Sequence, residues 1–109
     1  MTERQIEQAD IGALADIDQV IHARTRLTVL AHLYVVESAD FVFLKNMTGL
    51  TWGNLSSHLS KLEDAGYVAT EKGFSGKKPH TMIRLTDRGR TAFREYKQKM
   101  LQVLDDLPD

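Results

Sequence analysis

The sequence predicts one mainly α-helical domain with a small β-hairpin. Three observations lead to this fold class. First, the stretch from Thr51 to Val68 contains the signals that begin and end a helix. Second, two short segments of strand character follow it, separated by residues that favour a loop. Third, apolar residues recur at steps of three and four near the C-terminus, which predicts a long final helix.

The stretch after Thr51 predicts a helix with defined ends and one buried face. Thr51 is suited to the N-cap, because its hydroxyl can accept a hydrogen bond from a free N–H of the first turn. Gly66 falls where a left-handed residue commonly ends a helix. The face expected to be buried carries leucines at spacings of four and three, namely Leu55, Leu59 and Leu62.

The opposite face of this helix carries mostly short or uncharged polar residues. An exposed helix face usually carries many long charged side chains. Short side chains allow close approach to another polar surface, such as the base edges in a DNA major groove. A serine-rich surface helix without a partner is the alternative, and this helix alone does not separate the two. The residues of this face are Gly53, Ser57, Ser60 and Asp64, with Asn54 and Lys61 on one flank.

Two further helices are expected before Thr51. An apolar stripe predicts a first long helix over residues 20–37, which Asp18 could cap. Residues 38–40 interrupt it, and residues 41–48 predict a short second helix. Gly49 then supplies the left-handed residue of a tight turn. The second helix, this turn and the capped third helix have the layout of a helix-turn-helix.

The segment after Gly66 predicts a two-stranded hairpin. Residues 67–72 form the first expected strand and residues 80–85 the second, with Thr81, Ile83 and Leu85 on one face. Residues 73–79, with two glycines, a proline and two adjacent lysines, are expected to form a loop. A hairpin directly after such a helix is a wing, so the predicted fold is a winged helix-turn-helix.

The last helix is expected to begin after Thr86, a second suitable N-cap, and to run to about Leu107. Its apolar residues follow a heptad pattern. A small domain has little core to cover the far end of such a helix. We therefore predict that it pairs with a second copy of the chain, although packing on its own domain is the alternative. The residues of this predicted dimerisation seam are Phe93, Tyr96, Met100, Val103 and Leu107.

Basic charge is concentrated in the middle of the chain. The net charge of the 109 residues is only −1. Residues 1–20, however, contain one arginine and five acidic residues, whereas residues 45–90 contain eight lysines and arginines against four acidic residues. Local charge governs contact with phosphates more than the total does. The distribution therefore favours a nucleic-acid partner for residues 45–90.

Composition excludes several other classes. The chain has no cysteine, so it has neither disulfides nor thiolate metal sites. No apolar run approaches the roughly 20 residues of a membrane span, and the first residues lack the apolar segment of a signal peptide. A cytoplasmic protein without a cofactor is expected. Ser57 and His58 are neighbours that diverge on a helix, so they do not form a nucleophile–base pair of an enzyme.

Two motifs resemble a known family. Residues 54–68 (NLSSHLSKLEDAGYV) closely resemble a signature of small MarR-like and ArsR-like bacterial transcriptional regulators. Residues 84–90 (RLTDRGR) resemble the segment that joins the wing to the last helix in that group. The resemblance covers about residues 18–105. It departs from metal-sensing ArsR members, because the chain has neither their cysteine pair nor a recognisable His/Asp ligand set.

The resemblance implies a homodimer that binds a pseudo-palindromic site on double-stranded DNA; whether a small-molecule effector exists stays open. It divides the chain into a flexible N-terminal segment (1–17), a DNA-binding domain (18–86) and a dimerisation helix (87–109). A winged-helix module that binds only proteins is the alternative. The residues expected at DNA are Thr51, Trp52, Gly53, Asn54, Ser56, Ser57, Ser60 and Lys61 from the helix, and Lys72, Lys77, Lys78 and Arg84 from the hairpin.

Overall fold

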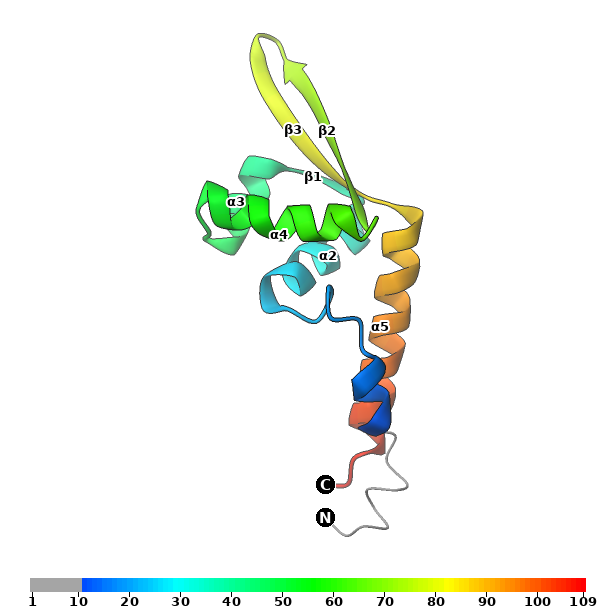
Figure 1. The fold of residues 1–109 in the computed structure, drawn as a ribbon. Coiled ribbons are helices and arrows are strands. Elements are labelled where there is room, and N and C mark those ends of the chain that lie inside the picture. Colours follow the sequence, from blue (N-terminus) through cyan, green and yellow to red (C-terminus); the bar gives the residue numbers. More distant parts are fainter. Residues whose placement is uncertain (1–10) are drawn as a thin grey trace.

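The computed structural model describes residues 11–109 and contains helices grouped around the base of a small sheet (Figure 1). The hairpin β2–β3 projects from one end of the molecule, and α5 runs away from its base in roughly the opposite direction. In chain order the elements are η1 (Ile11–Asp16), α2 (Arg24–Val36), β1 (Ser38–Asp40), α3 (Phe41–Thr48), α4 (Trp52–Asp64), β2 (Val68–Ser75), β3 (Lys78–Leu85) and α5 (Asp87–Asp106).

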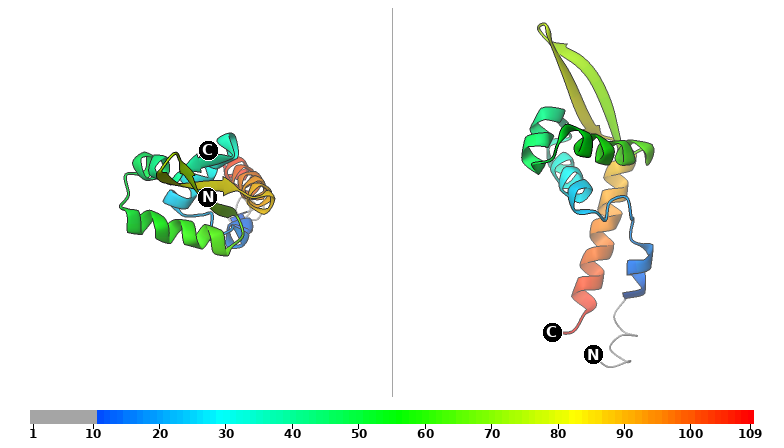
Figure 2. Two further views of the ribbon diagram at one scale, coloured as in Figure 1. Left: turned by 90° about the horizontal axis from the view of Figure 1, so that it is seen from above. Right: turned by 60° about the vertical axis from the view of Figure 1, so that its left-hand side comes forward.

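The structure confirms the predicted fold class, a mainly helical winged helix-turn-helix with a long C-terminal helix. The predicted flexible N-terminal segment covers residues 1–17. Residues 1–10 of the expected flexible segment lie outside the described residues. Ile11–Asp16, in contrast, form the 3₁₀ helix η1, and Ile17 after it is buried. Figure 2 shows η1 beside the distal half of α5, which it contacts.

Helix α2 begins four residues later than predicted. Asp18 Oδ1 accepts hydrogen bonds from the backbone N–H of Val20, at 2.9 Å, and of Ile21, at 3.2 Å. These bonds form a turn in place of a helix start, because a short acceptor side chain competes for the backbone donors. Ala23 is extended and becomes the N-cap. The turn buries Ile21 completely.

The sheet has a third strand that the sequence analysis missed. β1 pairs antiparallel with β3, Ser38 opposite Arg84 and Asp40 opposite Met82, which gives the strand order β1-β3-β2. Residues 38–40 were expected only to interrupt the helices. Three residues are too few for an alternating pattern, and this strand exists because β3 supplies its partner.

The hairpin is also longer than predicted. β2 and β3 continue through the expected loop 73–79 and leave a two-residue turn of Gly76 and Lys77, with Ser75 opposite Lys78. Gly76 has a φ of 65°, the left-handed value that such tight turns require. Pro79 fits into β3 because, among the described residues, β1 pairs with β3 only at residues 82–84.

The core lies between α2, α4 and the base of the sheet. All three leucines of the predicted stripe on α4 are buried, which confirms that face assignment. Ile83 and Leu85 of β3, which were predicted to share one face, are buried as well. Helix α4 therefore has a fixed inner face, which its three leucines form. The other large buried residues of the core are Ile17, Ile21, Val29, Leu30, Leu33, Leu44, Val68 and Tyr96.

Candidate nucleic-acid interface

The ends of α4 are held as its sequence predicted. Thr51 Oγ1 accepts a hydrogen bond from the N–H of Asn54 at 3.2 Å. Gly49, in the turn before the helix, has a φ of 71°, and Gly66, after the helix, has a φ of 80°. Both values lie in the left-handed region that favours glycine. Thr51 and Gly49 thus fix where α4 begins relative to α3.

The small polar face of α4 is exposed along its whole length. Each of its predicted members is exposed, and so are the flanking Asn54 and Lys61. A Cβ added at Gly53 would meet no heavy atom of residues 11–109 within 4 Å. Packing among these residues therefore does not require a glycine there. The face therefore presents short groups near the helix start and a bare Cα where another surface can come close.

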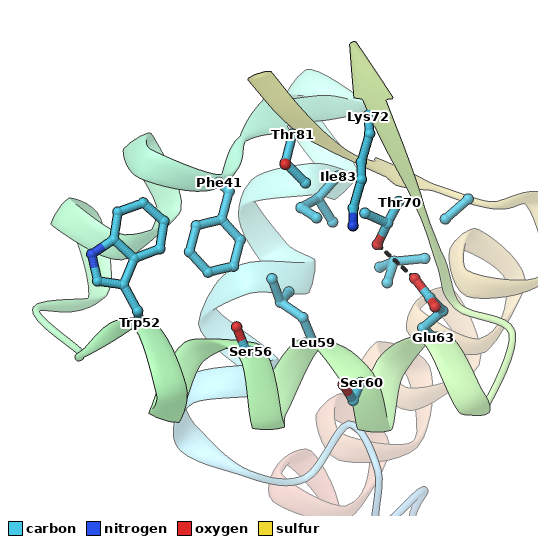
Figure 3. Close-up of a pocket in the computed structure, with 12 residues that line it drawn as sticks. Phe41, Trp52, Ser56, Leu59, Ser60, Glu63, Thr70, Lys72, Thr81 and Ile83 are labelled. Carbon is cyan, nitrogen blue, oxygen red and sulfur yellow. Dashed lines mark hydrogen bonds between the residues drawn. The ribbon is translucent and has the colours of Figure 1, made fainter. Parts of the chain in front are cut away.

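A groove of about 960 Å³ separates α4 from the sheet (Figure 3). We call it the α4–wing groove. Leu59, Val68 and Ile83 are buried side chains among its lining. At one end the Thr70 hydroxyl donates a hydrogen bond of 2.5 Å to Glu63. The polar residues along its walls are Ser56, Ser60 and Glu63 from α4 and Thr70, Lys72 and Thr81 from the sheet.

Two stacked aromatic rings form the other end of the α4–wing groove. The rings of Phe41 and Trp52 lie 4.9 Å apart between centroids and are within 7° of parallel. The Lys45 ammonium lies 5.7 Å from the centroid of the Trp52 ring, where a cation–π attraction acts. Trp52 nevertheless keeps 57% of its surface exposed. It therefore joins α3 to the start of α4 and still presents a ring surface at the mouth of the groove.

Three of the four predicted basic residues of the wing lie along the groove or at the tip. The Lys72 side chain lines the groove, Lys77 is in the turn, and Lys78 opens β3. Arg84 is placed differently. It lies on the opposite face of the sheet, where its Nε donates to Glu71 Oε1 at 2.9 Å. The structure therefore brings Lys72 to the side of α4 and places Lys77 at the tip, whereas Lys78, opposite Ser75, lies on the same sheet face as Arg84.

Behind α4, Arg26 joins three parts of the chain. Its guanidinium donates to the carbonyl of Val20 at 2.6 Å and lies 3.1 Å from Nδ1 of His58. Burial is the main cause that lowers the pKa of His58, and the positive charges of Arg26 and Lys61 lower it further. The imidazole is therefore held neutral, so that Nδ1 accepts the hydrogen bond. His58 therefore has a packing role between α4 and α2.

The base of the wing is tied to α3 through Asp40. Its carboxylate caps α3 by accepting from the N–H of Val42 at 2.7 Å, and it also lies 2.7 Å from Nδ1 of His80 on β3. The hydrogen bond to His80 is the main cause that lowers the pKa of Asp40. The sequence alone does not predict this link, because the link depends on the β1–β3 pairing. It holds the sheet against the helix-turn-helix.

The predicted seam on α5 is largely covered by the protomer itself. Tyr96 is buried, and Val103 is only 1% exposed. Leu101 and Leu104, which are not part of the predicted seam, are 54% and 58% exposed. A second copy of the chain therefore has more apolar surface available at these two leucines than on the seam. The other seam residues, Phe93, Met100 and Leu107, are half-buried.

Within residues 11–109, no set of three potential ligands among His, Asp and Glu is grouped closely enough for a metal ion. Among the same residues, no helix combines the length and the apolar character that crossing a membrane requires.

The chain resembles proteins with a DNA-binding fold. Residues 25–104 match the model of a family described as winged helix DNA-binding domains. An uncharacterised protein of Methanocaldococcus jannaschii is 39% identical over 85 residues, which cover 78% of this chain and 92% of that protein. Both matches include α4 and the wing, the elements that form the groove.

Solved structures share the same architecture. A transcriptional regulator homologue from Pyrococcus horikoshii superposes with a TM-score of 0.76 at 24% identity, covering 94% of this chain and 95% of that one. NadR in complex with 4-hydroxyphenylacetate gives a TM-score of 0.64 at 19% identity, covering 94% of this chain and 75% of that one. Overoxidised AbfR bound to DNA gives a TM-score of 0.62 at 21% identity, covering 98% of this chain and 68% of that one.

Proposed function

Because this chain belongs to the family of winged helix DNA-binding domains, we propose that it is a transcriptional regulator that binds a specific duplex DNA sequence as a homodimer. One observation carries the sequence-specific part of this proposal. The exposed face of α4 consists of short polar side chains, and it lies beside a wing that presents three lysines. This combination suits a helix in the major groove and a backbone contact next to it.

Helix α4 is the element that distinguishes bases. Asn54 and Ser57 lie in its first two turns, on or beside the exposed face. Their amide and hydroxyl groups are short, so they reach base edges only when the helix lies deep in the major groove. The open space around Gly53 supports such an approach. An asparagine that binds an adenine through two hydrogen bonds contributes about 1–3 kcal/mol of discrimination.

The wing supplies contacts that depend little on sequence. Lys77 and Lys78 are exposed at its tip, and Lys72 lines the groove between the wing and α4. A lysine acts as a point charge without the planar fork of an arginine, so it suits phosphates better than base edges. The sugar-phosphate chain that borders the major groove would then lie along the α4–wing groove.

The homodimer is proposed from the surface of α5. Leu101 and Leu104 are more than half exposed near the end of a helix that extends beyond the domain core. Pairing two copies there would cover both leucines. It would also present two α4 helices, which fit half-sites about 34–36 Å apart on one face of the duplex.

In-vitro selection from random duplexes tests the proposed function. We expect enrichment of an inverted repeat whose halves are one helical turn apart, and affinity that falls steeply with salt. A scrambled duplex of the same composition is the matched control. Enrichment of a single half-site would remove the dimer from the proposal. Failure to bind any selected duplex at low salt would leave the alternative, a winged-helix module that binds proteins.

A further inference from the structure

We propose that Phe74 and Pro79 form an apolar wedge near the tip of the wing, and that this wedge enters the minor groove of the bound duplex. The inference rests on the proposed DNA binding and adds a contact of a different kind. Lysines were the only residues predicted to contact DNA at the wing tip. Phe74 was placed in the expected loop, where its direction could not be known.

The strand register places the wedge on the groove side of the wing. Phe74 lies directly opposite Pro79, two positions beyond the pair of Lys72 and Thr81. Successive side chains of a strand alternate between the two faces of a sheet. Phe74 and Pro79 therefore point to the same side as Lys72 and Thr81, which line the α4–wing groove. This face changes from buried core at its base, to polar groove wall, to an apolar pair near the tip.

Packing within the protomer does not explain the aromatic ring. Phe74 is 76% exposed, so its burial contributes little to the core. Its backbone, in contrast, is well held. It belongs to a regular antiparallel ladder, and the two-residue turn with left-handed Gly76 fixes the register beyond it. The phenyl ring is thus presented at a fixed place on a projecting arm, as an inserting side chain requires.

Charge around the wedge favours DNA over an apolar protein pocket. Lys72 precedes Phe74 by two residues on the same strand face, Lys77 lies in the turn, and Lys78 begins β3 on the opposite face. These cations can lie along the phosphates that border the minor groove while the ring and Pro79 enter it. Apolar side chains that insert at a base step partly unstack it and kink the duplex. A protein pocket that accepts a phenyl ring has no need of three cations around it.

The wedge would give the protein a preference at base pairs that α4 does not touch. Pyrimidine–purine steps unstack more easily than other steps. We therefore expect one flexible step, such as TA or CA, at a constant distance outside each half-site in the selected duplexes. This preference reflects the ease of deforming the duplex and not hydrogen bonds to base edges.

The test uses the full chain and one selected duplex, with 2-aminopurine placed in turn at the steps beneath the wing. Binding of the wild-type chain should raise the fluorescence at one step, because unstacking removes the quenching by its neighbour. Phe74→Ala should abolish that rise and weaken binding about tenfold or more, the effect expected for losing a buried phenyl ring. Phe74→Leu keeps an apolar side chain and should retain most of both effects.

Val35→Ala is the matched control, because Val35 is an apolar residue of α2 that is 79% exposed. It should change neither fluorescence nor affinity. If the wild-type chain binds but Phe74→Ala binds equally tightly with the same fluorescence, the wedge is overturned and DNA binding stands. If the wild-type chain binds no selected duplex, the proposed function fails and the wedge fails with it. The thermal unfolding of Phe74→Ala should match the wild type, which excludes a folding defect as the cause.

Discussion

Helices α4 and α5 begin in the same way but present different outer surfaces. Each follows a threonine whose hydroxyl accepts a hydrogen bond from the backbone three residues on, Thr51 from Asn54 at 3.2 Å and Thr86 from Gly89 at 3.0 Å. Each buries an apolar stripe against the domain. Beyond that stripe, α4 presents short polar groups, whereas α5 presents Leu101 and Leu104.

This difference follows from where each helix lies. α4 packs along its whole length on the core, so its leucines are covered inside the protomer and its outer face is free to be polar. α5 extends past the core, and the described residues that contact its distal half belong mainly to the short η1. A polar partner such as DNA fits the first surface, and an apolar partner such as a second copy fits the second. Each prediction below tests one side of this comparison.

The largest effect is expected on the apolar side. Replacing both Leu101 and Leu104 by Glu should make the protein monomeric, because burial of each leucine is worth about 1.5–3 kcal/mol and a glutamate resists burial. Sedimentation velocity measures the result. The paired change Gln98→Glu and Gln102→Glu adds the same charge to exposed positions of α5 and should leave the dimer intact. A dimer that survives the leucine changes would place the contact elsewhere.

The next largest effect is expected on the free energy of unfolding and compares the first turns of α4 and α5. A Cβ at Gly89 would lie 2.1 Å from the carbonyl oxygen of Tyr67, so the backbone must move. We expect Gly89→Ala to lower the free energy of unfolding by about 3 kcal/mol, at the upper end of overpacking costs. Gly53→Ala has open space and should raise it by up to about 1 kcal/mol, because alanine favours the helix. Urea titration distinguishes these results, and equal stabilities would contradict the close packing at Gly89.

Gly53→Ala also tests the polar surface in a second way. If α4 lies deep in the major groove, the added methyl should weaken DNA binding even though the free protein is at least as stable as the wild type. Binding to the selected duplex is the measurement. Unchanged affinity would mean that DNA does not approach α4 at its first turn.

A smaller effect on DNA affinity should distinguish the role of α4 from that of the wing. Asn54→Ala should cost about 1–3 kcal/mol on the selected duplex and much less on a scrambled one. Replacing Lys77 and Lys78 by Ala should weaken both duplexes about equally and reduce the slope of log affinity against log salt by roughly one to two units. Four binding isotherms over a salt series give the result. Should the lysine pair affect only the selected duplex, the two roles would have to be exchanged.

The smallest effect concerns the inner side of α4. The pKa of His58 is lowered in the fold from its ordinary value of 6.5, so the unfolded chain binds more protons below that pH. The contribution of His58 to the free energy of unfolding is therefore complete above pH 6.5. It declines as the pH falls from 6.5 toward the lower pKa that His58 has in the folded protein. His58→Gln should flatten the dependence of stability on pH between 7 and 5. If the variant and the wild type lose stability in parallel over that range, the contact with Arg26 does not depend on the protonation of His58.

Local signals in the sequence were sufficient to predict α4 and the start of α5. Thr51, Thr86 and Gly66 act on their own neighbours, and the leucine stripe needs only helical spacing. Two errors have different causes. β1 depends on a distant partner, because it is formed by pairing with β3. The late start of α2 is local, because Asp18 binds the backbone of its own turn.

The candidate site was predictable to the same degree. The exposed face of α4 follows from helical spacing alone, and its side chains are placed as expected. The hairpin residues depend on register, which the predicted loop hid. Extending the alternation of β2 from Val68 through Thr70 and Lys72 would have placed Phe74 on the groove side. The pairing of Arg84 with Glu71 needs the observed strand register, so the sequence alone did not predict it.

The joint between α4 and α5 has a mechanical consequence. The Thr86 hydroxyl donates to the carbonyl of Gly66 at 2.6 Å, and the Thr86 N–H donates to the carbonyl of Tyr67 at 3.0 Å. The residues that end α4 are therefore bonded directly to the cap of α5, with Gly89 packed closely against them. In a dimer joined through α5, each α5 would act as a lever that is rigidly connected to the α4 helix of its own protomer. A small change in the angle between the two α5 helices would be amplified into a change in the spacing of the two α4 helices on the duplex.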